Sequence, residues 1–194
     1  MKEEITKFFN DCKNSIDELN EQCGTLEDII NILQKAQKNS NTIYTIGNGG
    51  SGSTASHFVS DLLKTSITKE AKRFMAISLV DNVPVNLAWS NDQSFDSIFV
   101  EQLKNFLKSD DVVVAFSGSG NSKNVLDAIK FAKENGAICV AFSGMDGGKL
   151  KNICDKCIIV KSQDMLVIES DHLAICHCII DSIRKSGTPL FKYD

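Results

Sequence analysis

The sequence predicts an α/β protein, namely a three-layer α/β/α sandwich with a central parallel sheet, preceded by N-terminal helices. After residue 41, short apolar runs alternate with segments of helical periodicity, which is the pattern of repeated β-α units. The run Val112–Phe116 is continuously apolar, as expected of a parallel strand covered on both faces. Right-handed crossovers between such strands place helices on both sides of the sheet.

Residues 1–40 predict two helices. Apolar side chains recur near helical spacing in two series, which Cys23 and Gly24 separate. The first series is Ile5, Phe8, Phe9, Cys12, Ile16 and Leu19, and the second is Leu26, Ile29, Ile30, Ile32, Leu33 and Ala36. Because the sheet or a partner subunit must cover these apolar faces, we expect the chain to form an oligomer.

The later segments predict strands and helices that belong to one sheet. We expect strands at residues 42–46, 74–79, 111–116, 137–143 and 156–161. We expect helices at residues 51–65, 84–90, 95–107, 122–134, 147–153 and 165–186. Because the chain has only two prolines and no linker-like tract, we expect a single domain over residues 1–194, with residues 1–40 as an N-terminal helical extension.

The composition limits the class of partner. A formal net charge of −4 and a pI near 5.4 provide no broad basic surface for nucleic acid or anionic lipid. No stretch approaches the ~20 apolar residues of a membrane span, and the first residues lack the apolar core of a signal peptide. We therefore expect a cytoplasmic protein with a small-molecule partner and with no nucleic-acid or membrane partner.

The seven cysteines favour reduced thiols. Their number is odd and they are spread over predicted helices and strands, which argues against a disulfide framework. The C-x-x-C pair Cys154 and Cys157 has no second pair to complete a structural zinc site. A metal or redox role for this pair is therefore disfavoured.

Two small-residue loops follow predicted strands at the points where helices begin. The first is Gly47, Asn48, Gly49, Gly50 and Ser51, and the second is Ser117, Gly118, Ser119, Gly120, Asn121 and Ser122. Glycines allow close approach of the backbone, hydroxyl and amide groups donate hydrogen bonds, and helix N-termini favour negative charge. The loops therefore predict an anion site, most simply for phosphate, although ordinary strand-to-helix turns also favour these residues.

A dinucleotide site is the natural competitor. Gly47, Gly49 and Gly52 have the G-x-G-x-x-G spacing between a strand and a helix. The acidic residue expected about 20 positions later is missing, since that stretch reads Ala71-Lys72-Arg73. Neither loop has the G-K-[ST] ending of nucleotide-binding P-loops, so a nucleotide cofactor is disfavoured.

Side chains suited to proton transfer fall on two predicted helices. His57 and Asp61 are four residues apart beside the first loop, and Glu169, His172 and His177 lie on the final helix. A carboxylate with a histidine can move a proton between adjacent carbons of a sugar through an enediol. The same side chains could bind zinc, or they could be surface or interface residues without chemistry.

Five motifs together resemble the sugar isomerase (SIS) domain and, more narrowly, the phosphoheptose isomerases. They are Gly47–Ser51, His57-Phe58, Asn91-Asp92 with Phe95, Ser117–Ser122, and Asp146-Gly147-Gly148-Lys149. The resemblance covers nearly the whole chain. It implies conversion of sedoheptulose 7-phosphate to a glycero-manno-heptose 7-phosphate in bacterial lipopolysaccharide or capsule synthesis. It also implies a homotetramer with its sites between subunits and the leading helices in its core.

The resemblance implies a role for each matching residue. Substrate binding is implied for Asn48, Gly49, Gly50, Ser51, Asn91, Asp92, Ser117, Gly118, Ser119 and Ser122, with the serines holding the phosphate. Zinc binding is implied for His57, Asp61, Glu169 and His177. Asp61 is the expected base that removes a carbon-bound proton, and His177 is the expected partner that moves protons on the sugar.

Three departures from the family pattern keep alternatives open. Asp61 stands where Glu is usual, Glu169 where Gln is usual, and Gly118 where Thr is common. The shorter Asp61 withdraws its carboxylate by roughly 1.5 Å, and Glu169 adds a negative charge. The alternatives are an isomerase for a different phosphosugar of a surface-glycan pathway, and a non-enzymatic SIS-domain adaptor that binds a protein partner.

Overall fold

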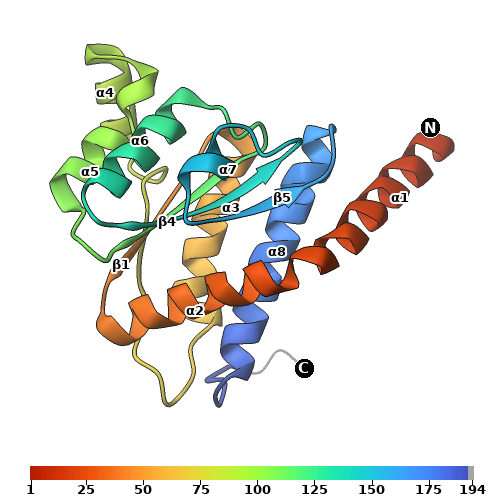
Figure 1. Ribbon diagram of the computed structural model, residues 1–194, viewed down its shortest axis with the longest axis horizontal. Coiled ribbons are helices and arrows are strands. Elements are labelled where there is room, and N and C mark those ends of the chain that lie inside the picture. The colour runs from red at the N-terminus through yellow and green to blue at the C-terminus, as the bar shows by residue number, and fades with distance from the viewer. Residues whose placement is uncertain (192–194) are drawn as a thin grey trace.

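Five parallel strands form one sheet in the order β2-β1-β3-β4-β5 (Figure 1). The computed structural model describes residues 1–191. The strands are β1 (Thr42–Gly47), β2 (Met75–Ser78), β3 (Val112–Ser117), β4 (Ile138–Gly144) and β5 (Lys156–Val160). All four strand pairs are parallel, and every residue of β3 is buried. The predicted three-layer sandwich with a parallel sheet is therefore confirmed.

Helices cover the sheet on both faces. They are α1 (Lys2–Leu19), α2 (Cys23–Asn39), α3 (Gly49–Ser60), α4 (Val83–Asp92), α5 (Val100–Phe106), α6 (Lys123–Glu134), α7 (Leu150–Ile153) and α8 (Met165–Lys185). One apolar core joins α2, α3 and α8 to the sheet, and the other joins α5, α6 and α7 to its opposite face. Among residues 1–191, no helix has the length and apolar character needed to cross a bilayer.

The helix α1 extends beyond the rest of the molecule (Figure 1). A single 3-10 turn, Asn20–Gln22, separates α1 from α2. The break therefore lies just before Cys23 and Gly24, which form the first turn of α2. Along α1, the side chains of Ile5, Phe9 and Ile16 are exposed, and we call this surface the α1 apolar face.

The two predicted loops meet at one point of the sheet. The neighbouring strands β1 and β3 pair in parallel, with Gly47 opposite Phe116. The chain leaves β1 into α3 on one face of the sheet and leaves β3 into α6 on the other. Such a reversal in strand order opens a crevice at the carboxyl ends of the strands, where ligands of α/β proteins bind.

The helix expected at residues 51–65 differs in detail. It begins earlier, because Gly49 adopts a φ of +56° that a larger residue would rarely accept. After Ser60 the helix continues as a π-helix, Asp61–Thr65, in which the Ser66 N–H donates to the Asp61 carbonyl over 2.9 Å. Residues 95–107, expected as one helix, form a 3-10 turn at Phe95–Ser97 and then the short α5.

Candidate active site

A cavity of about 170 Å³ lies between the two predicted loops. We call it the serine-loop cavity, and its lining residues are Asn48, Ser51, Phe116, Ser117, Gly118, Ser119, Ser122, Met165 and Glu169. No lysine or arginine is among them. An anion in this cavity would therefore be bound by hydroxyl and N–H groups rather than by a cationic side chain.

Two helix N-termini face this cavity. Asn48 is the N-cap of α3 and Ser122 is the N-cap of α6, and neither side chain bonds to its own helix. The Ser117 hydroxyl lies 3.5 Å from that of Ser122, and the Ser119 hydroxyl accepts from the Asn121 N–H over 3.2 Å. Because the N-terminus of a helix favours negative charge, the arrangement suits a phosphate.

Glycines make room for two side chains of α8 at this cavity. A Cβ at Gly50 would overlap the carboxylate of Glu169, and a Cβ at Gly118 would overlap the sulfur of Met165. Gly49 adopts positive φ at the start of α3. Gly49 and Gly50 therefore shape the wall of the cavity through their backbone, although neither lines it directly.

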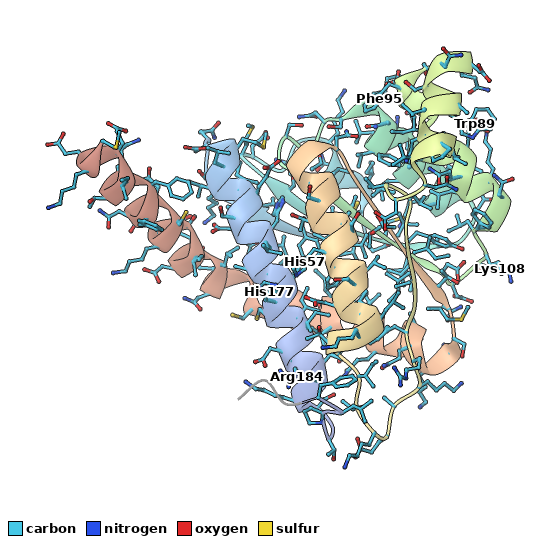
Figure 2. All side chains as sticks on the ribbon, turned by 180° about the vertical axis from the view of Figure 1, so that it is seen from behind. His57, Trp89, Phe95, Lys108, His177 and Arg184 are labelled. Carbon is cyan, nitrogen blue, oxygen red and sulfur yellow. The ribbon has the colours of Figure 1, made fainter. Side chains whose placement is uncertain are left out.

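A second group of predicted residues, His57, Asp61 and His177, meets where α3 and its π-helical end lie beside α8 (Figure 2). We call it the His–Asp–His cluster. The Asp61 Oδ2 atom lies 3.2 Å from His57 Nε2 and 3.8 Å from His177 Nε2. The two Nε2 atoms are 3.1 Å apart. Both imidazoles are about half exposed, whereas 14% of the Asp61 side chain is exposed.

The π-helix at Asp61–Thr65 orients the carboxylate of the cluster. The Thr65 hydroxyl donates to Asp61 Oδ1 over 2.8 Å, which leaves Oδ2 facing the imidazoles. Short π-helical segments occur frequently at functional sites, where they redirect a side chain. A further cavity of about 280 Å³ reaches this cluster, with Asp61, Thr65, His177 and Arg184 among its lining residues.

The cluster has the chemistry of a zinc site. Its three ligand atoms lie within 4.8 Å of one another. A tetrahedral zinc ion with bonds of about 2.0–2.1 Å holds its ligand atoms about 3.3–3.4 Å apart, close to the separations of 3.1 to 3.8 Å found here. Two imidazoles and one carboxylate also leave a coordination position for a further ligand.

Glu169, the fourth predicted zinc ligand, lies at the serine-loop cavity and is not among the three clustered residues. Eight residues separate it from His177, which is about 12 Å along α8. Within one chain, α8 thus presents a carboxylate to the anion cavity and an imidazole to the cluster.

His172 has no place in this site. It is fully buried, its Nε2 atom donates to the Ser143 carbonyl over 3.1 Å, and its ring packs edge-on against the stacked rings of Phe116 and Phe142. Burial lowers the pKa of His172 to about 4, with the hydrogen bond to Ser143 opposing part of the shift. His172 is therefore a neutral core residue.

Asn91 and Asp92 lie away from both groups. They end α4, where the Asn91 side-chain amide donates to Asp92 Oδ1 over 2.8 Å. Figure 2 shows the neighbouring Trp89 and Phe95 far from His57 and His177. Neither Asn91 nor Asp92 lines the serine-loop cavity.

The paired cysteines Cys154 and Cys157 also lie outside the site. Burial raises the pKa of Cys157 to about 11 and that of Cys154 further. Both thiols are protonated at neutral pH, which makes them poor metal ligands and poor nucleophiles.

Phe116 and Met165, which line the serine-loop cavity, were not predicted as site residues from the sequence, and neither was Asn124 beside it. Asn124 is buried in the first turn of α6, where its amide pairs with that of Asn48. An asparagine near a helix start is common for reasons of capping, so its type and position gave no signal. Only the pairing of β1 with β3 brings it to Asn48.

Comparisons with known proteins agree with this geometry. A family model of the SIS domain matches residues 7–144. The probable phosphoheptose isomerase of Thermoplasma acidophilum is 40% identical over 157 residues, covering 79% of this chain and 86% of the relative. The phosphoheptose isomerase of Clostridium acetobutylicum is 35% identical over 160 residues, covering 82% of this chain and 81% of the relative.

Solved structures show the same likeness. A phosphoheptose isomerase from Francisella tularensis superposes with a TM-score of 0.88 at 27% identity, covering 94% of this chain and 97% of that one. The phosphoheptose isomerase of Neisseria gonorrhoeae gives a TM-score of 0.87 at 26% identity, covering 95% and 98%. The chain therefore belongs to the SIS-domain family and, within it, to the phosphoheptose isomerases, which makes it a sugar-phosphate isomerase.

Proposed function

We propose that this chain converts sedoheptulose 7-phosphate to a glycero-manno-heptose 7-phosphate by aldose–ketose isomerisation. The observation that supports this most is the placement of two sites along α3 and α8. One is a cavity of hydroxyls and helix N-termini suited to a phosphate, and the other is the His–Asp–His cluster suited to proton transfer. The relatives named as phosphoheptose isomerases support the choice of sugar.

The serine loop is proposed to hold the phosphate and fix the reacting carbons near the cluster. Ser117, Ser119 and Ser122 donate hydrogen bonds to the phosphate oxygens, supported by the N-terminus of α6. Asn48 and Ser51 complete the other wall through the N-terminus of α3. Binding at a distance from the chemistry supplies the orientation that the proton transfer needs.

In the proton transfer, Asp61 removes a carbon-bound proton and His177 moves a proton on the neighbouring carbon or oxygen. Asp61 acts through Oδ2, because Oδ1 already accepts from Thr65. His57 lies 3.2 Å from that same oxygen and helps to hold it. The enediol formed between the two steps is the ordinary intermediate of this reaction class.

Zinc is the proposed cofactor, with His57, Asp61 and His177 as ligands. Glu169, the fourth ligand implied by the family resemblance, instead lies at the serine-loop cavity of the same chain. When bound, zinc polarises the substrate oxygens and makes the adjacent carbon-bound proton more acidic. A zinc bond to Oδ2 would take the atom that otherwise serves as base. Whether Asp61 is base or ligand is therefore decided at a single oxygen.

We further propose a homotetramer. The α1 apolar face needs a cover, and α4 exposes Val83 and Leu87. The separation of Asn91 and Asp92 from the serine-loop cavity supports a site completed by another subunit. The single-domain organisation and the cytoplasmic location expected from the sequence stay predictions.

Conversion of sedoheptulose 7-phosphate, followed by NMR, tests the proposed function. The purified protein should form the aldose, and His177→Ala should reduce turnover on the order of 10²–10⁴-fold, because a general acid–base group contributes that much. Glu27→Gln, an exposed carboxylate change on α2, should leave turnover intact. Absence of turnover by the wild type would remove the heptose assignment.

A different phosphosugar is the second candidate, favoured by Asp61 and Glu169. Glu169 lines the serine-loop cavity, and Asp61 lines the cavity at the His–Asp–His cluster, so each departure from the family pattern falls at a proposed site. The same assay with pentose, hexose and heptose phosphates separates the two candidates. If a pentose or hexose phosphate gives the highest kcat/KM, that sugar phosphate replaces the heptose phosphate as the proposed substrate.

A further inference from the structure

Two side-chain amides, those of the half-buried Asn48 and the buried Asn124, connect the loops that form the serine-loop cavity. The Asn48 side-chain N–H donates to Asn124 Oδ1 over 2.9 Å, and the Asn124 side-chain N–H donates back to Asn48 Oδ1 over 2.8 Å. Only 2% of Asn124 is exposed. For the buried Asn124 amide, Asn48 is therefore the hydrogen-bond partner in place of water.

The pair joins the two halves of the cavity. Asn48 directly follows β1 and caps α3, whereas Asn124 lies in the first turn of α6, after the serine loop that follows β3. The strands β1 and β3 are neighbours, but the chain between Asn48 and Asn124 is 76 residues long. The amide pair is therefore a direct cross-link between loops that are distant in sequence.

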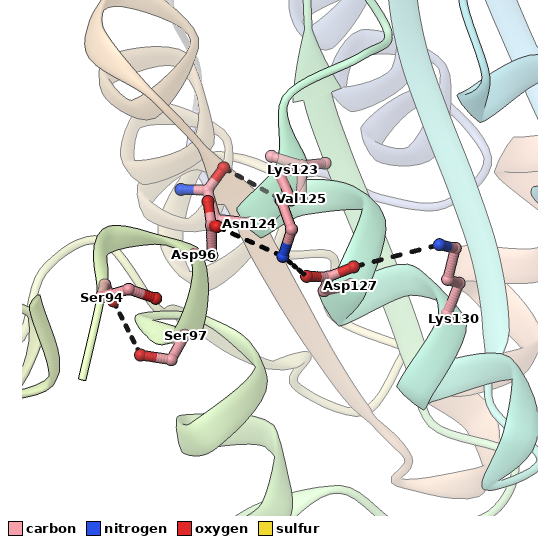
Figure 3. A network of polar contacts seen from close by, with 8 residues as sticks. All are labelled: Ser94, Asp96, Ser97, Lys123, Asn124, Val125, Asp127 and Lys130. Atoms are coloured by element: carbon pink, nitrogen blue, oxygen red, sulfur yellow. Dashed lines mark hydrogen bonds and ion pairs between the residues drawn. The ribbon is translucent and has the colours of Figure 1, made fainter.

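A further hydrogen bond fixes the orientation of Asn124. Its Oδ1 atom also accepts from the Val125 N–H over 2.9 Å (Figure 3). Beside it, Lys123 forms ion pairs with Asp96 over 3.2 Å and Asp127 over 2.6 Å, which hold the start of α6 against the segment before α5. The Asn124 side chain thus projects toward Asn48 from a braced helix start.

We propose that Asn124 is a positioning residue, which sets the separation of the two anion loops by holding the Asn48 side chain. Asn124 does not line the cavity, so it acts on a ligand through Asn48. Because the Asn48 amide is committed to Asn124, Asn48 serves the anion through the backbone at the start of α3. This proposal rests on the phosphate role of the cavity in the proposed function.

A double-mutant cycle with inorganic phosphate tests the proposal without any sugar turnover. The full chain and its Asn48→Ala, Asn124→Ala and doubly substituted variants are titrated with inorganic phosphate by calorimetry. Each single variant should bind about tenfold more weakly, because loss of either side chain removes both hydrogen bonds that join the two loops. The double variant should be no weaker than the single variants, because the pair acts as one unit.

Two controls separate positioning from general damage. Asn135→Ala changes an exposed asparagine at the other end of α6 and should bind phosphate as the wild type does. In Asn124→Ala, the KM for the sugar phosphate should rise while kcat changes less than twofold, and zinc affinity should stay unchanged. A loss of folding would instead lower kcat, phosphate affinity and zinc affinity together.

Three results would overturn the proposal: wild-type phosphate affinity in Asn124→Ala, additive effects in the cycle, or no phosphate binding by the wild type. If Asn124→Ala does not fold, Asn124→Ser takes its place, since a serine is too short to reach Asn48. If the phosphate cycle shows coupling between Asn48 and Asn124 but the protein isomerises no sugar phosphate, the positioning role of Asn124 stands and the proposed function is rejected.

Discussion

Glu169 is the one charged side chain that lines the serine-loop cavity. Its carboxylate lies against Gly50, beside serines that are proposed to bind a phosphate. Two negative groups at such close range repel unless a cation lies between them. In the absence of a cation, Glu169 therefore opposes the binding of an anion in this cavity.

In metal-free protein, Glu169→Gln should bind inorganic phosphate on the order of tenfold more tightly, because the substitution removes the repulsion and keeps the side-chain shape. The gain should shrink as sodium chloride is added, since salt screens the charge. Calorimetric titration measures both effects, with Glu134→Gln on α6 as the exposed control. Weaker phosphate binding in Glu169→Gln would contradict the assignment of the cavity.

His172 makes stability depend on pH. Its folded-state pKa is about 4, below the ordinary value of 6.5, because burial disfavours the charged imidazole. As pH falls from 6.5 toward 4, the unfolded chain therefore takes up a proton before the folded chain does. Folding should lose up to about 3 kcal/mol over this range through His172.

Urea unfolding at pH 7, 6, 5 and 4 checks this loss. In His172→Gln, an amide can still donate to the Ser143 carbonyl but does not titrate. The variant should lose less stability than the wild type between pH 6.5 and 4. Parallel losses in the two proteins would show that His172 is not the titrating group.

Residue types and spacing were sufficient to predict most of the candidate site. The four-residue interval between His57 and Asp61 placed both on one helix face, and the serine loop was recognised from its small residues. Helical position alone could not separate His172 from His177, because both lie on one helix and the packing of Phe116 and Phe142 buries the first; the family resemblance selected His177. Hydrogen bonds between distant loops, such as Asn48 with Asn124, leave no periodic pattern.

Among the elements, the contact of α1 with α8 contains an unusual group. Asp171 of α8 is fully buried, and neither carboxylate oxygen has a hydrogen-bond partner among the described residues. The nearby Ser15 hydroxyl of α1 donates instead to the carbonyls of Asp11 and Cys12, each over 3.0 Å. Burial raises the pKa of Asp171, and Ser15 offsets only part of the rise.

Replacing this carboxylate by an apolar side chain of similar size should stabilise the fold. Asp171→Val should add about 1–3 kcal/mol to the free energy of unfolding at pH 7, since an unpartnered buried polar group is removed. Because the folded-state pKa of Asp171 is raised, the wild type loses stability as pH rises above 3.8 toward that pKa. The stability advantage of Asp171→Val over the wild type should therefore disappear in acid, where the Asp171 carboxyl is protonated. Urea unfolding at pH 7 and pH 3.5 measures both, and a destabilised variant at pH 7 would show that the carboxylate has a partner in the assembled protein.

Element boundaries were predicted less well than element order. Short apolar runs located all five strands, because the strands of a parallel sheet covered on both faces are largely apolar. The π-helix at Asp61–Thr65 escaped prediction, since one wider turn leaves the apolar spacing of α3 nearly unchanged. The 3-10 turn before α5 was absorbed into a longer helix for the same reason.

At the scale of the whole molecule, the projecting α1 is the feature that a single chain does not explain. The α1 apolar face stays in contact with solvent in one chain, although such faces are normally covered. The proposed tetramer would cover it and would bring Asn91 and Asp92 of one subunit to the cavity of another. Assembly and activity are then linked.

A charge on the α1 apolar face tests this link. Phe9→Lys should shift the protein from tetramers to smaller species and lower turnover together, because a lysine is costly to bury in an apolar contact. Light scattering after size-exclusion chromatography measures the mass. Asn14→Lys, an exposed position on the other side of α1, should leave mass and turnover unchanged. If Phe9→Lys dissociates into smaller species and keeps full turnover, a single chain contains the complete active site and the proposed link is wrong.

The most direct measurement of the central claim is isomerisation of sedoheptulose 7-phosphate in D₂O, followed by proton and deuterium NMR. Proton removal by Asp61 and its return through the cluster predict an aldose 7-phosphate with solvent deuterium at C2, and turnover reduced on the order of 10²–10⁴-fold in His177→Ala. Product with no deuterium, or full turnover in His177→Ala, would contradict acid–base catalysis by the His–Asp–His cluster.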